Sequence, residues 1–543
     1  MCLHKLIKAS AISIIGMAAF AASATALAYS DVPPEHWASE TIDRITETGI
    51  MQGRGNDEFG LGQSVTRGEF AAMLLRLMGW EEGDDNSPAF SDTAAGMWYT
   101  GEAAALAEHG IVSGDTFRPD DNITRSEMAV MLIKALGYDN IAEGITDSTF
   151  SDVTSDIGYI EAARDFGIIN GKSDSVFDPN GTALREESAA MMMRLYDKYY
   201  SRLSDIHGFY AISSWSQRDT AAQMDSVSFG WGTLEFTDGG SVNLNTSSDG
   251  GNSWYIPEGY EDAVSYLDQN GVSENFAVTM TDQEDCRAIL TVPENRTEAV
   301  RLLAEISSGY DGITIDFEGM KGAELRSGLN EFIKELRTAL GEKTLFVAVH
   351  PVLKNSSEYY DAYDYRTLGE YADSVILMAH DYAAYTMPDS LLNTDFISTP
   401  VTPFDEVYHA LKCITDPLTG VADTSKIKLA LSLSSTAAWE TENGMISNPQ
   451  SIHPAMETVV SRLSQTDTEI NYSDTYRNPY AWYSTEDGKR ILIWYEDSRS
   501  VKDKIELARM FGINSISIWR IGEITNAGAD IYMDIWDTIL SEK

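Results

Sequence analysis

The spacing of apolar residues divides the chain into two regions. Up to about residue 200, apolar residues recur at the three- and four-residue intervals of a helix face, as in the stretch 70–77. From about residue 206 onward, short apolar runs alternate with longer amphipathic stretches, which predicts alternating strands and helices. The predicted strands lie at residues 208–214, 226–230, 276–280, 312–317, 345–349, 374–379, 428–433 and 515–519. This alternation favours an α/β fold, a closed (β/α)8 TIM barrel, with an inserted subdomain at about 443–494.

The first region consists of three repeats spaced by about 60 residues. Each opens with an aromatic residue followed by Ser-Asp, and each closes with a helix that starts with Arg-x-Glu, at residues 67–69, 125–127 and 185–187. Thr66 and Thr124 stand before these helices and predict capping boxes with Glu69 and Glu127. One repeat is too small to bury its apolar face, so we expect the three to pack together. The predicted boundaries are 29–88, 89–148 and 149–202, with the barrel at 203–543.

This repeat pattern resembles the S-layer homology domain, present as an α-rich triplet. The resemblance implies binding to a pyruvylated secondary cell-wall polymer, in which an arginine of each repeat contacts the acidic sugar ketal. Carried over, it points to Arg67, Arg125 and Arg185, with Asp31, Asp92 and Asp152 near the same pockets. A guanidinium fork suits a carboxylate; the alternative is that each arginine only braces its own helix start. The third repeat has Leu184 in place of threonine and lacks the early tryptophan, which leaves the role of Arg185 open.

Two acids end the predicted strand 312–317. Positions 312, 314, 316 and 318 share one face, which points inward in a barrel. Asp316 and Glu318 come last, at the carboxyl end, where barrel enzymes keep their active sites. Two close carboxylates raise the pKa of one of them, and a carboxyl that keeps its proton is suited to general acid catalysis. A metal site is the alternative, but no histidine or further acid cluster accompanies the pair, so we expect no metal and no cofactor.

The segment 311–318 resembles the Asp-x-x-Asp-x-Asp-x-Glu signature of family 18 glycoside hydrolases. Residues 493–500 resemble in particular the spore-coat and cortex-lytic branch, and the likeness covers about 206–540. The family implies substrate-assisted retaining catalysis: Glu318 protonates the glycosidic oxygen, and Asp316 orients the 2-acetamido group that attacks the anomeric carbon. Thr314 and His380 depart from the family pattern, because they replace an aspartate and a tyrosine.

The same resemblance suggests a sugar-binding set around the two acids. Trp519 is expected to form the floor under the reacting sugar, and Asp381 to bind a sugar hydroxyl. His380 or Tyr382 is expected to donate to the acetamido oxygen, and Trp231 and Tyr210 are weaker candidates for which packing is the alternative. The predicted function is a wall-anchored hydrolase of β-1,4 bonds next to N-acetylglucosamine, with peptidoglycan the preferred substrate and chitin the second. The alternative is an inactive carbohydrate-binding or structural S-layer protein.

Charge and the N-terminus restrict the partners and the location. The formal net charge of −45 excludes nucleic acid and anionic membranes as partners. Three cysteines, at positions 2, 286 and 413, exclude a disulfide framework. Lys5 and Lys8 precede a weakly apolar run that ends in Ala-Leu-Ala at 26–28, which predicts a signal peptide over 1–28, with an uncleaved anchor as the alternative. We therefore expect a secreted protein associated with the cell wall or S-layer, without membrane contact once the signal is removed.

Overall fold

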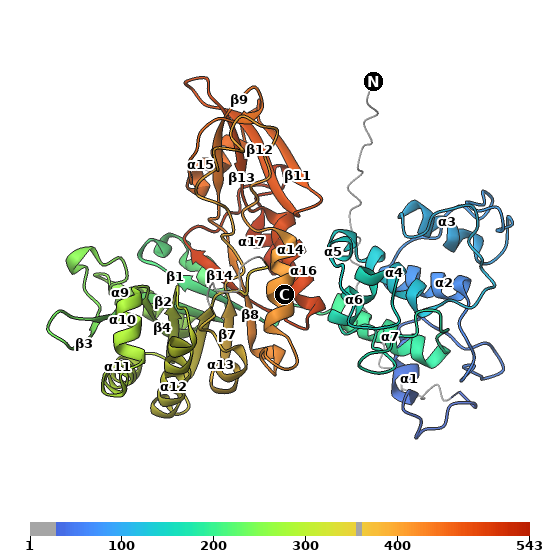
Figure 1. Cartoon of the computed structure of the whole chain (residues 1–543), viewed down its shortest axis with the longest axis horizontal. Helices are drawn as coiled ribbons and strands as arrows, with labels where there is room; N and C mark the ends of the chain where they lie inside the picture. Colours follow the sequence, from blue (N-terminus) through green and yellow to red (C-terminus); the bar gives the residue numbers. More distant parts are fainter. Residues whose placement is uncertain (1–28, 355–360) are drawn as a thin grey trace.

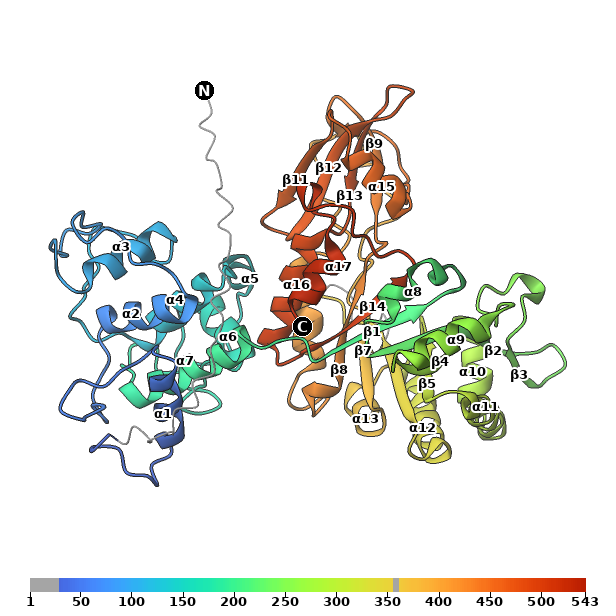
Figure 2. The same ribbon diagram turned by 180° about the vertical axis from the view of Figure 1, so that it is seen from behind.

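The structure is a computed structural model that describes residues 29–354 and 361–543, so the predicted signal peptide lies outside the described residues. Helices of the N-terminal third form one body, and a larger body of strands surrounded by helices contains the rest of the chain (Figure 1). A smaller sheet projects from one end of the larger body, and the view from behind shows the same three parts (Figure 2).

The three repeats form a closed ring. The backbone N–H of Arg67 donates to Asp121 of the second repeat, that of Arg125 to Gly181 of the third, and that of Arg185 back to Gln63 of the first, each at 2.9 Å. Thr66 and Thr124 make the predicted capping boxes, whereas Leu184 offers no capping oxygen. The helices of this body are α1 (Ser39–Glu47), α2 (Arg67–Met78), α3 (Thr100–Glu108), α4 (Arg125–Ala135), α5 (Asp139–Gly144), α6 (Ile157–Asp165) and α7 (Arg185–Tyr199).

The larger body is a closed barrel of eight parallel strands, as the sequence predicts. The strands are β1 (Asp205–Tyr210), β2 (Ser226–Phe236), β4 (Ser273–Met280), β5 (Gly312–Phe317), β6 (Thr344–Val349), β7 (Ser374–Leu377), β8 (Ile427–Ser432) and β14 (Ser515–Ile521). Each pairs with the next, and β1 closes the ring by pairing with both β14 and β2. The short β3 (Val242–Asn245) adds antiparallel to the far end of β2, which therefore runs six residues beyond its predicted end at 230.

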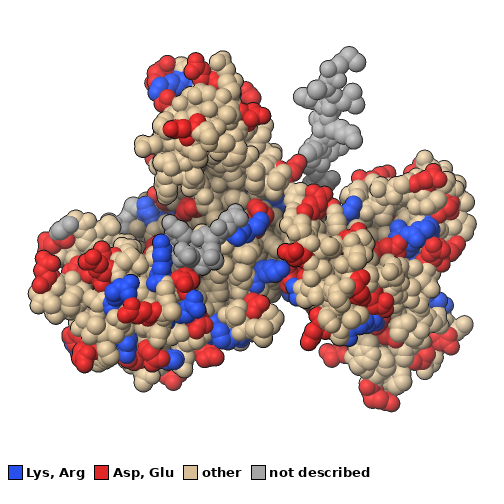
Figure 3. Space-filling model, viewed as in Figure 1, with Lys and Arg blue, Asp and Glu red and all other residues tan. Residues whose placement is uncertain are grey.

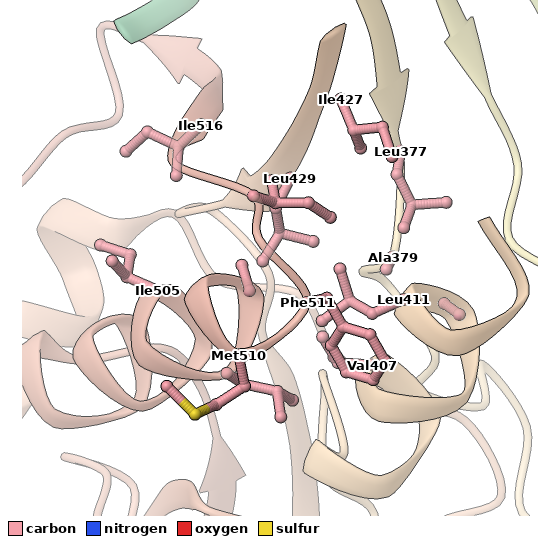
Figure 4. Packing of buried hydrophobic residues seen from close by; sticks show 14 of the residues in the cluster. Leu377, Ala379, Val407, Leu411, Ile427, Leu429, Ile505, Met510, Phe511 and Ile516 are labelled. Atoms are coloured by element: carbon pink, nitrogen blue, oxygen red, sulfur yellow. The ribbon is translucent and has the colours of Figure 1, made fainter. Parts of the chain in front are cut away.

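Helices cover the outside of the barrel. They are α8 (Arg218–Ala221), α9 (Tyr260–Gln269), α10 (Gln283–Leu290), α11 (Pro293–Ile306), α12 (Ala323–Leu340), α13 (Tyr365–Tyr371), α14 (Phe404–Ile414), α16 (Ser498–Met510) and α17 (Ile535–Ser541). Figure 4 shows this packing at one side, where Leu377 and Leu429 of the strands lie near Val407, Leu411 and Phe511 of the helical layer. Burial of such apolar surface is the main force that holds the layers together.

An insertion between the last two barrel strands forms its own antiparallel sheet. Its elements are β9 (Ala437–Glu442), β10 (Met445–Ile446), α15 (Met456–Leu463), β11 (Glu469–Ser473), β12 (Asn478–Ser484) and β13 (Arg490–Trp494), in the sheet order β10-β9-β13-β12-β11. Trp439 and Trp494 fill a separate small core. A buried ion pair between Glu496 and Lys504, 2.9 Å apart, lies where the insertion rejoins the barrel helices.

The third repeat packs directly on the barrel. The Phe166 ring lies 5.3 Å from that of Phe511 and 5.9 Å from that of Tyr408, measured between centroids. Asp165 beside it accepts a hydrogen bond from the Tyr408 hydroxyl at 2.7 Å and pairs with Lys412 at 2.6 Å. The ring of repeats and the barrel therefore share one continuous apolar core.

Acidic side chains are spread over both bodies on the face seen in Figure 3. Within residues 29–354 and 361–543, no helix combines the length and apolar character needed to cross a membrane. Cys286 and Cys413 are both free thiols.

Candidate functional site

Asp316 and Glu318 line one cavity of about 480 Å³ at the carboxyl ends of the barrel strands. Along β5, Ile313 and Ile315 belong to the apolar core, while Thr314 bonds to interior side chains of neighbouring strands. This is the alternation expected of a strand with one face inward. The predicted acids therefore meet on the interior face at the open end of the barrel.

The surroundings of the Asp316 carboxyl favour its protonated form. Its side chain is almost fully buried, and its Oδ1 has no hydrogen-bond partner among the described residues. Burial raises the pKa of Asp316 well above its ordinary value, and the charge of Glu318 raises it further. Asp316 therefore keeps its proton to a higher pH than an ordinary aspartate does.

A neutral polar network lies below the acids. The Thr314 hydroxyl is 2.6 Å from that of Ser228 and accepts from the Asn275 amide at 3.2 Å. His207, in turn, bonds to the hydroxyls of Ser228 and Ser517, both at 2.8 Å. Burial holds the pKa of His207 well below its ordinary value, so the imidazole is neutral. The hydroxyl of Thr314 thus stands where the family signature has a carboxylate, and it carries no charge.

Three consecutive residues after β7, at 380–382, also line the cavity. His380 Nδ1 lies 2.8 Å from Asp381 Oδ2, and Asp381 also accepts a hydrogen bond from the Ser435 hydroxyl. Burial alone would raise the pKa of Asp381, but these partners hold it below its ordinary value. The Tyr382 hydroxyl is buried, with no hydrogen-bond partner among the described residues. The structure thus brings both candidate acetamido donors, His380 and Tyr382, to the same cavity as the acids.

Of the three predicted aromatic residues, Trp519 lines the acid cavity and Tyr210 lines a neighbouring one. Trp231 does not reach either cavity. It is fully buried, with its ring stacked on that of Phe229 at 4.1 Å, and it lies edge-on to Tyr260 at 5.6 Å. The sugar-binding prediction for Trp231 is therefore corrected: positions 229 and 231 alternate to the outer face of β2, toward the helices.

Two further polar residues of the cavity, His350 and Tyr385, were not among the predicted site residues. His350 Nε2 lies 3.5 Å from Glu318 Oε2, close to the predicted proton donor. Tyr385 is 69% exposed at the cavity wall, with its ring 4.8 Å from that of His453 in the insertion. His350 could have been found from the sequence, because it directly follows the apolar run 345–349 and so lies at the carboxyl end of a predicted barrel strand. Tyr385 lies in a loop and carried no such signal.

The predicted arginines of the repeats are buried, and each reaches into the next repeat. The side-chain Nε of Arg67, Arg125 and Arg185 donates to the carbonyl of Phe117, Phe177 and Phe59, at 2.7, 2.9 and 2.8 Å. Each guanidinium also lies over the ring of that phenylalanine, 4.7–5.4 Å from its centroid. The alternative that each arginine braces its own helix start is therefore corrected, because the side chains link neighbouring repeats.

Two hollows between repeats contain these arginines, and we name them by the repeat that provides the floor. Groove I, of about 440 Å³, combines residues of repeat 1 with a tryptophan of repeat 2 and an arginine of repeat 3; its polar and aromatic members are Gln52, Arg54, Glu69, Arg76, Trp98 and Arg185. Groove III, of about 290 Å³, is built in the same way from the members Trp37, Arg125, Asn170, Lys172, Glu187 and Arg194. Each groove therefore holds three basic side chains and one indole.

The equivalent location on repeat 2, groove II, keeps basic side chains but lacks the indole. Arg67 enters it and pairs with Glu127 at 3.0 Å. Arg118 also pairs with Glu127, as Arg54 pairs with Glu69 and Lys172 with Glu187 in the other grooves. The sequence, however, places Ser155 where the other grooves have a tryptophan. The missing tryptophan of repeat 3 thus depletes groove II, whereas Arg185 belongs to the well-equipped groove I.

The aspartates of the repeats bind their own loops. Asp31 accepts from the N–H groups of Phe59, Gly60 and Leu61 at 2.7–2.9 Å, which outweighs the effect of burial and lowers the pKa of Asp31. Asp92 and Asp152 accept in the same way from residues 117–118 and 177–178. In the described ranges, no group of three or more potential ligands is arranged to hold a metal ion.

Comparison with known proteins agrees with this geometry. The family model "Glycosyl hydrolases family 18" matches residues 274–523, which include the acid pair and Trp519. The barrel belongs to glycosyl hydrolase family 18. The model of the S-layer homology domain matches residues 28–71, 89–129 and 149–189, so three such domains precede the family 18 barrel.

Individual relatives resemble parts of the chain. An amylopullulanase of Thermoanaerobacterium thermosulfurigenes is 34% identical over 174 residues, 30% of this chain and 9% of its own length. An S-layer protein of Bacillus thuringiensis subsp. finitimus is 26% identical over 197 residues, 35% of this chain and 24% of its own length. The match thus covers less than a quarter of the length of either relative.

The solved structure of the Bacillus cereus spore cortex-lytic enzyme SleL shares the fold. It has a TM-score of 0.51 and 18% identity, and the match covers 63% of this chain and 75% of that one. The matches together confirm the predicted family 18 barrel and the three repeats.

Proposed function

We propose that this chain is a glycoside hydrolase that cleaves β-1,4 bonds next to N-acetylglucosamine by substrate-assisted retaining catalysis. The observation that carries the proposal is the meeting of Asp316, Glu318 and Trp519 in one cavity at the mouth of a family 18 barrel. The cavity contains two carboxyls and an indole, as this chemistry requires: a proton donor, an acceptor for the acetamido N–H and an apolar floor for a pyranose ring.

In the first step, the acetamido N–H of the bound sugar donates to Asp316. A carboxylate accepts this bond better than a carboxyl does, so the proton resting on Asp316 passes to Glu318. The acetamido oxygen then bonds to the anomeric carbon while the bond from this carbon to the glycosidic oxygen breaks. Glu318 delivers its proton to the leaving oxygen, and the anionic Asp316 stabilises the positive charge of the oxazolinium ion.

In the second step, water attacks the anomeric carbon and the bond to the acetamido oxygen breaks. Glu318 accepts the proton of the water, so the product keeps the original anomeric configuration and the pair again holds one proton. The hydroxyl of Thr314 cannot accept the proton of Asp316, because it is neutral and already bonded to Ser228 and Asn275. The proton therefore moves only within the Asp316–Glu318 pair.

Peptidoglycan is the preferred substrate in this proposal, and chitin is the second. The fold likeness to a spore cortex-lytic enzyme and the three S-layer homology domains support a substrate in the cell wall. We further propose that grooves I and III bind the pyruvylated secondary cell-wall polymer, with Arg185 and Arg125 facing its carboxylates. The protein would thus be secreted and held at the cell wall or S-layer.

Glu318→Gln in the intact protein tests the catalytic proposal. We expect kcat for release of reducing ends from N-acetylglucosamine oligomers and from peptidoglycan to fall about 10²- to 10⁴-fold, because the proton donor is lost. Glu324→Gln is the matched control, since this exposed glutamate pairs only with Arg287 in an ion pair on the outer surface. If wild type and Glu318→Gln have equal activity on every N-acetylated substrate, the catalytic proposal is wrong, and the alternative of a carbohydrate-binding barrel without turnover is favoured.

A further inference from the structure

A second cavity, of about 430 Å³, adjoins the acid cavity at the mouth of the barrel. The two share Phe209 and Trp519 as lining residues, so they lie next to each other at the indole of Trp519. The second cavity contains neither Asp316 nor Glu318, and its aromatic wall is completed by Tyr210 and Trp254. It has no role in the catalytic steps described above.

Trp254 lies beside Trp519 with its ring in almost the same orientation. The two ring centroids are 6.3 Å apart and the planes differ by 22°. A half-buried indole that lines a cavity suits the apolar face of a pyranose ring, as proposed for Trp519. Two such faces, about one sugar residue apart and nearly parallel, match successive rings of an extended glycan.

The backbone of β2 leaves room for the Trp254 ring. Gly230 points into the second cavity, and a Cβ at this position would lie only 3.4 Å from two atoms of the indole. The ring therefore rests against bare backbone, and a larger side chain at 230 would push it outward.

A clamp formed by Asn252 fixes the loop that carries Trp254. The Asn252 side-chain oxygen accepts from the Trp254 N–H and from the Thr233 hydroxyl, both at 2.9 Å. The Asn252 side-chain amide donates to the carbonyl oxygens of Trp254 at 2.7 Å and Ser247 at 3.0 Å. Trp254 is thus held before any sugar binds, which reduces the entropy lost on binding.

We propose that Trp254 forms a second sugar-binding platform, for the sugar that follows the reacting one on the side away from Glu318. This rests on the proposed function. The bond to be cleaved lies beside Glu318, in the acid cavity, so a chain that continues over Trp519 in the other direction reaches Trp254. The sugar on Trp254 therefore belongs to the fragment that leaves with the new reducing end, and the protein selects substrates with at least two sugars on this side.

Aryl glycosides of one and of two N-acetylglucosamine residues test this with the intact protein. The first fills only the site over Trp519, and the second also reaches Trp254. The quantity to compare is kcat/KM for the two-sugar glycoside divided by kcat/KM for the one-sugar glycoside. We expect Trp254→Leu to lower this ratio about tenfold, because leucine keeps apolar packing on Gly230 but offers no flat face. Trp254→Tyr should retain most of the ratio. Trp215→Ala is the control, because this exposed tryptophan lines neither cavity.

A ratio in Trp254→Leu equal to that of wild type would overturn the platform. Binding of an N-acetylglucosamine pentamer, measured by calorimetry, separates this result from failure of the catalytic proposal. If wild type cleaves neither glycoside, a roughly tenfold weaker affinity of Trp254→Leu for the pentamer supports the platform, and an unchanged affinity refutes it.

Discussion

Replacing the three arginines of the repeats one at a time should separate wall binding from folding. In all three, the guanidinium Nε donates to a phenylalanine carbonyl at 2.7–2.9 Å, and all three side chains are less than 10% exposed. Each guanidinium also makes a second polar contact, with the carbonyl of Asn170 for Arg125, the carbonyl of Gln52 for Arg185 and the carboxylate of Glu127 for Arg67. Alanine at any of them should therefore lower the free energy of unfolding by a similar amount, about 1.5–3 kcal/mol for each bond lost from a charged donor. Arg67→Ala is thus the matched control for Arg125→Ala and Arg185→Ala.

The binding cost should differ among the three variants. Grooves I and III hold three basic side chains and a tryptophan each, whereas groove II has Ser155 in place of the indole. A guanidinium–carboxylate contact contributes about 1.5–3 kcal/mol, which is about 10- to 150-fold in affinity. In the proposed anchoring, two grooves bind one polymer together, so losing either also removes the gain from multivalency. Arg67→Ala should bind walls almost as well as wild type.

Co-sedimentation of the intact protein with purified cell walls measures this, with thermal unfolding of each variant as the control for folding. We expect Arg125→Ala and Arg185→Ala to remain in the supernatant at wall concentrations that pellet wild type and Arg67→Ala. Walls stripped of ketal pyruvate should release wild type as well. If Arg67→Ala loses as much wall binding as the other two at equal stability, the distinction between the grooves is wrong.

Two further predictions concern buried charges. Burial, together with the charge of Glu318, raises the pKa of Asp316 in the folded protein above its value in the unfolded chain. Asp316 therefore destabilises the folded state increasingly as the pH rises above the ordinary pKa range of an aspartate. Asp316→Asn should therefore raise the free energy of unfolding by about 1–3 kcal/mol at pH 8 and leave it unchanged near pH 3. Denaturant titrations at both pH values measure this. An equal gain in stability at both pH values would contradict the reasoning. Lys504→Met should lower the free energy of unfolding by about 3–5 kcal/mol, because it leaves Glu496 as a buried charge without its partner. The double variant Lys504→Met/Glu496→Leu should recover most of this loss in urea titrations, and a double variant no more stable than the single one would argue against the pairing.

The strands could be predicted because their signal is local. β5 begins and ends where the apolar alternation does, and the other seven strands overlap their predicted ranges. The end of β2 was missed because its last residues pair with β3 outside the barrel, and sequence periodicity carries no record of such a partner. Trp231 shows the opposite case: its sugar-binding prediction was wrong, although Phe229, two residues earlier on the same strand, shares its face and stacks on its ring in the structure.

The sequence by itself determined the order of strands and helices, the two acids at the end of one strand, and the starts of the repeat helices, because each depends on side chains a few positions apart. Only the tertiary structure decided which loop each arginine meets. Arg185 bonds to Phe59, 126 residues away, because ring closure brings the last repeat against the first. Packing likewise decided that Trp254 lies beside Trp519 and His350 beside Glu318, because closing the barrel brings together strand ends and loops that are distant in the chain.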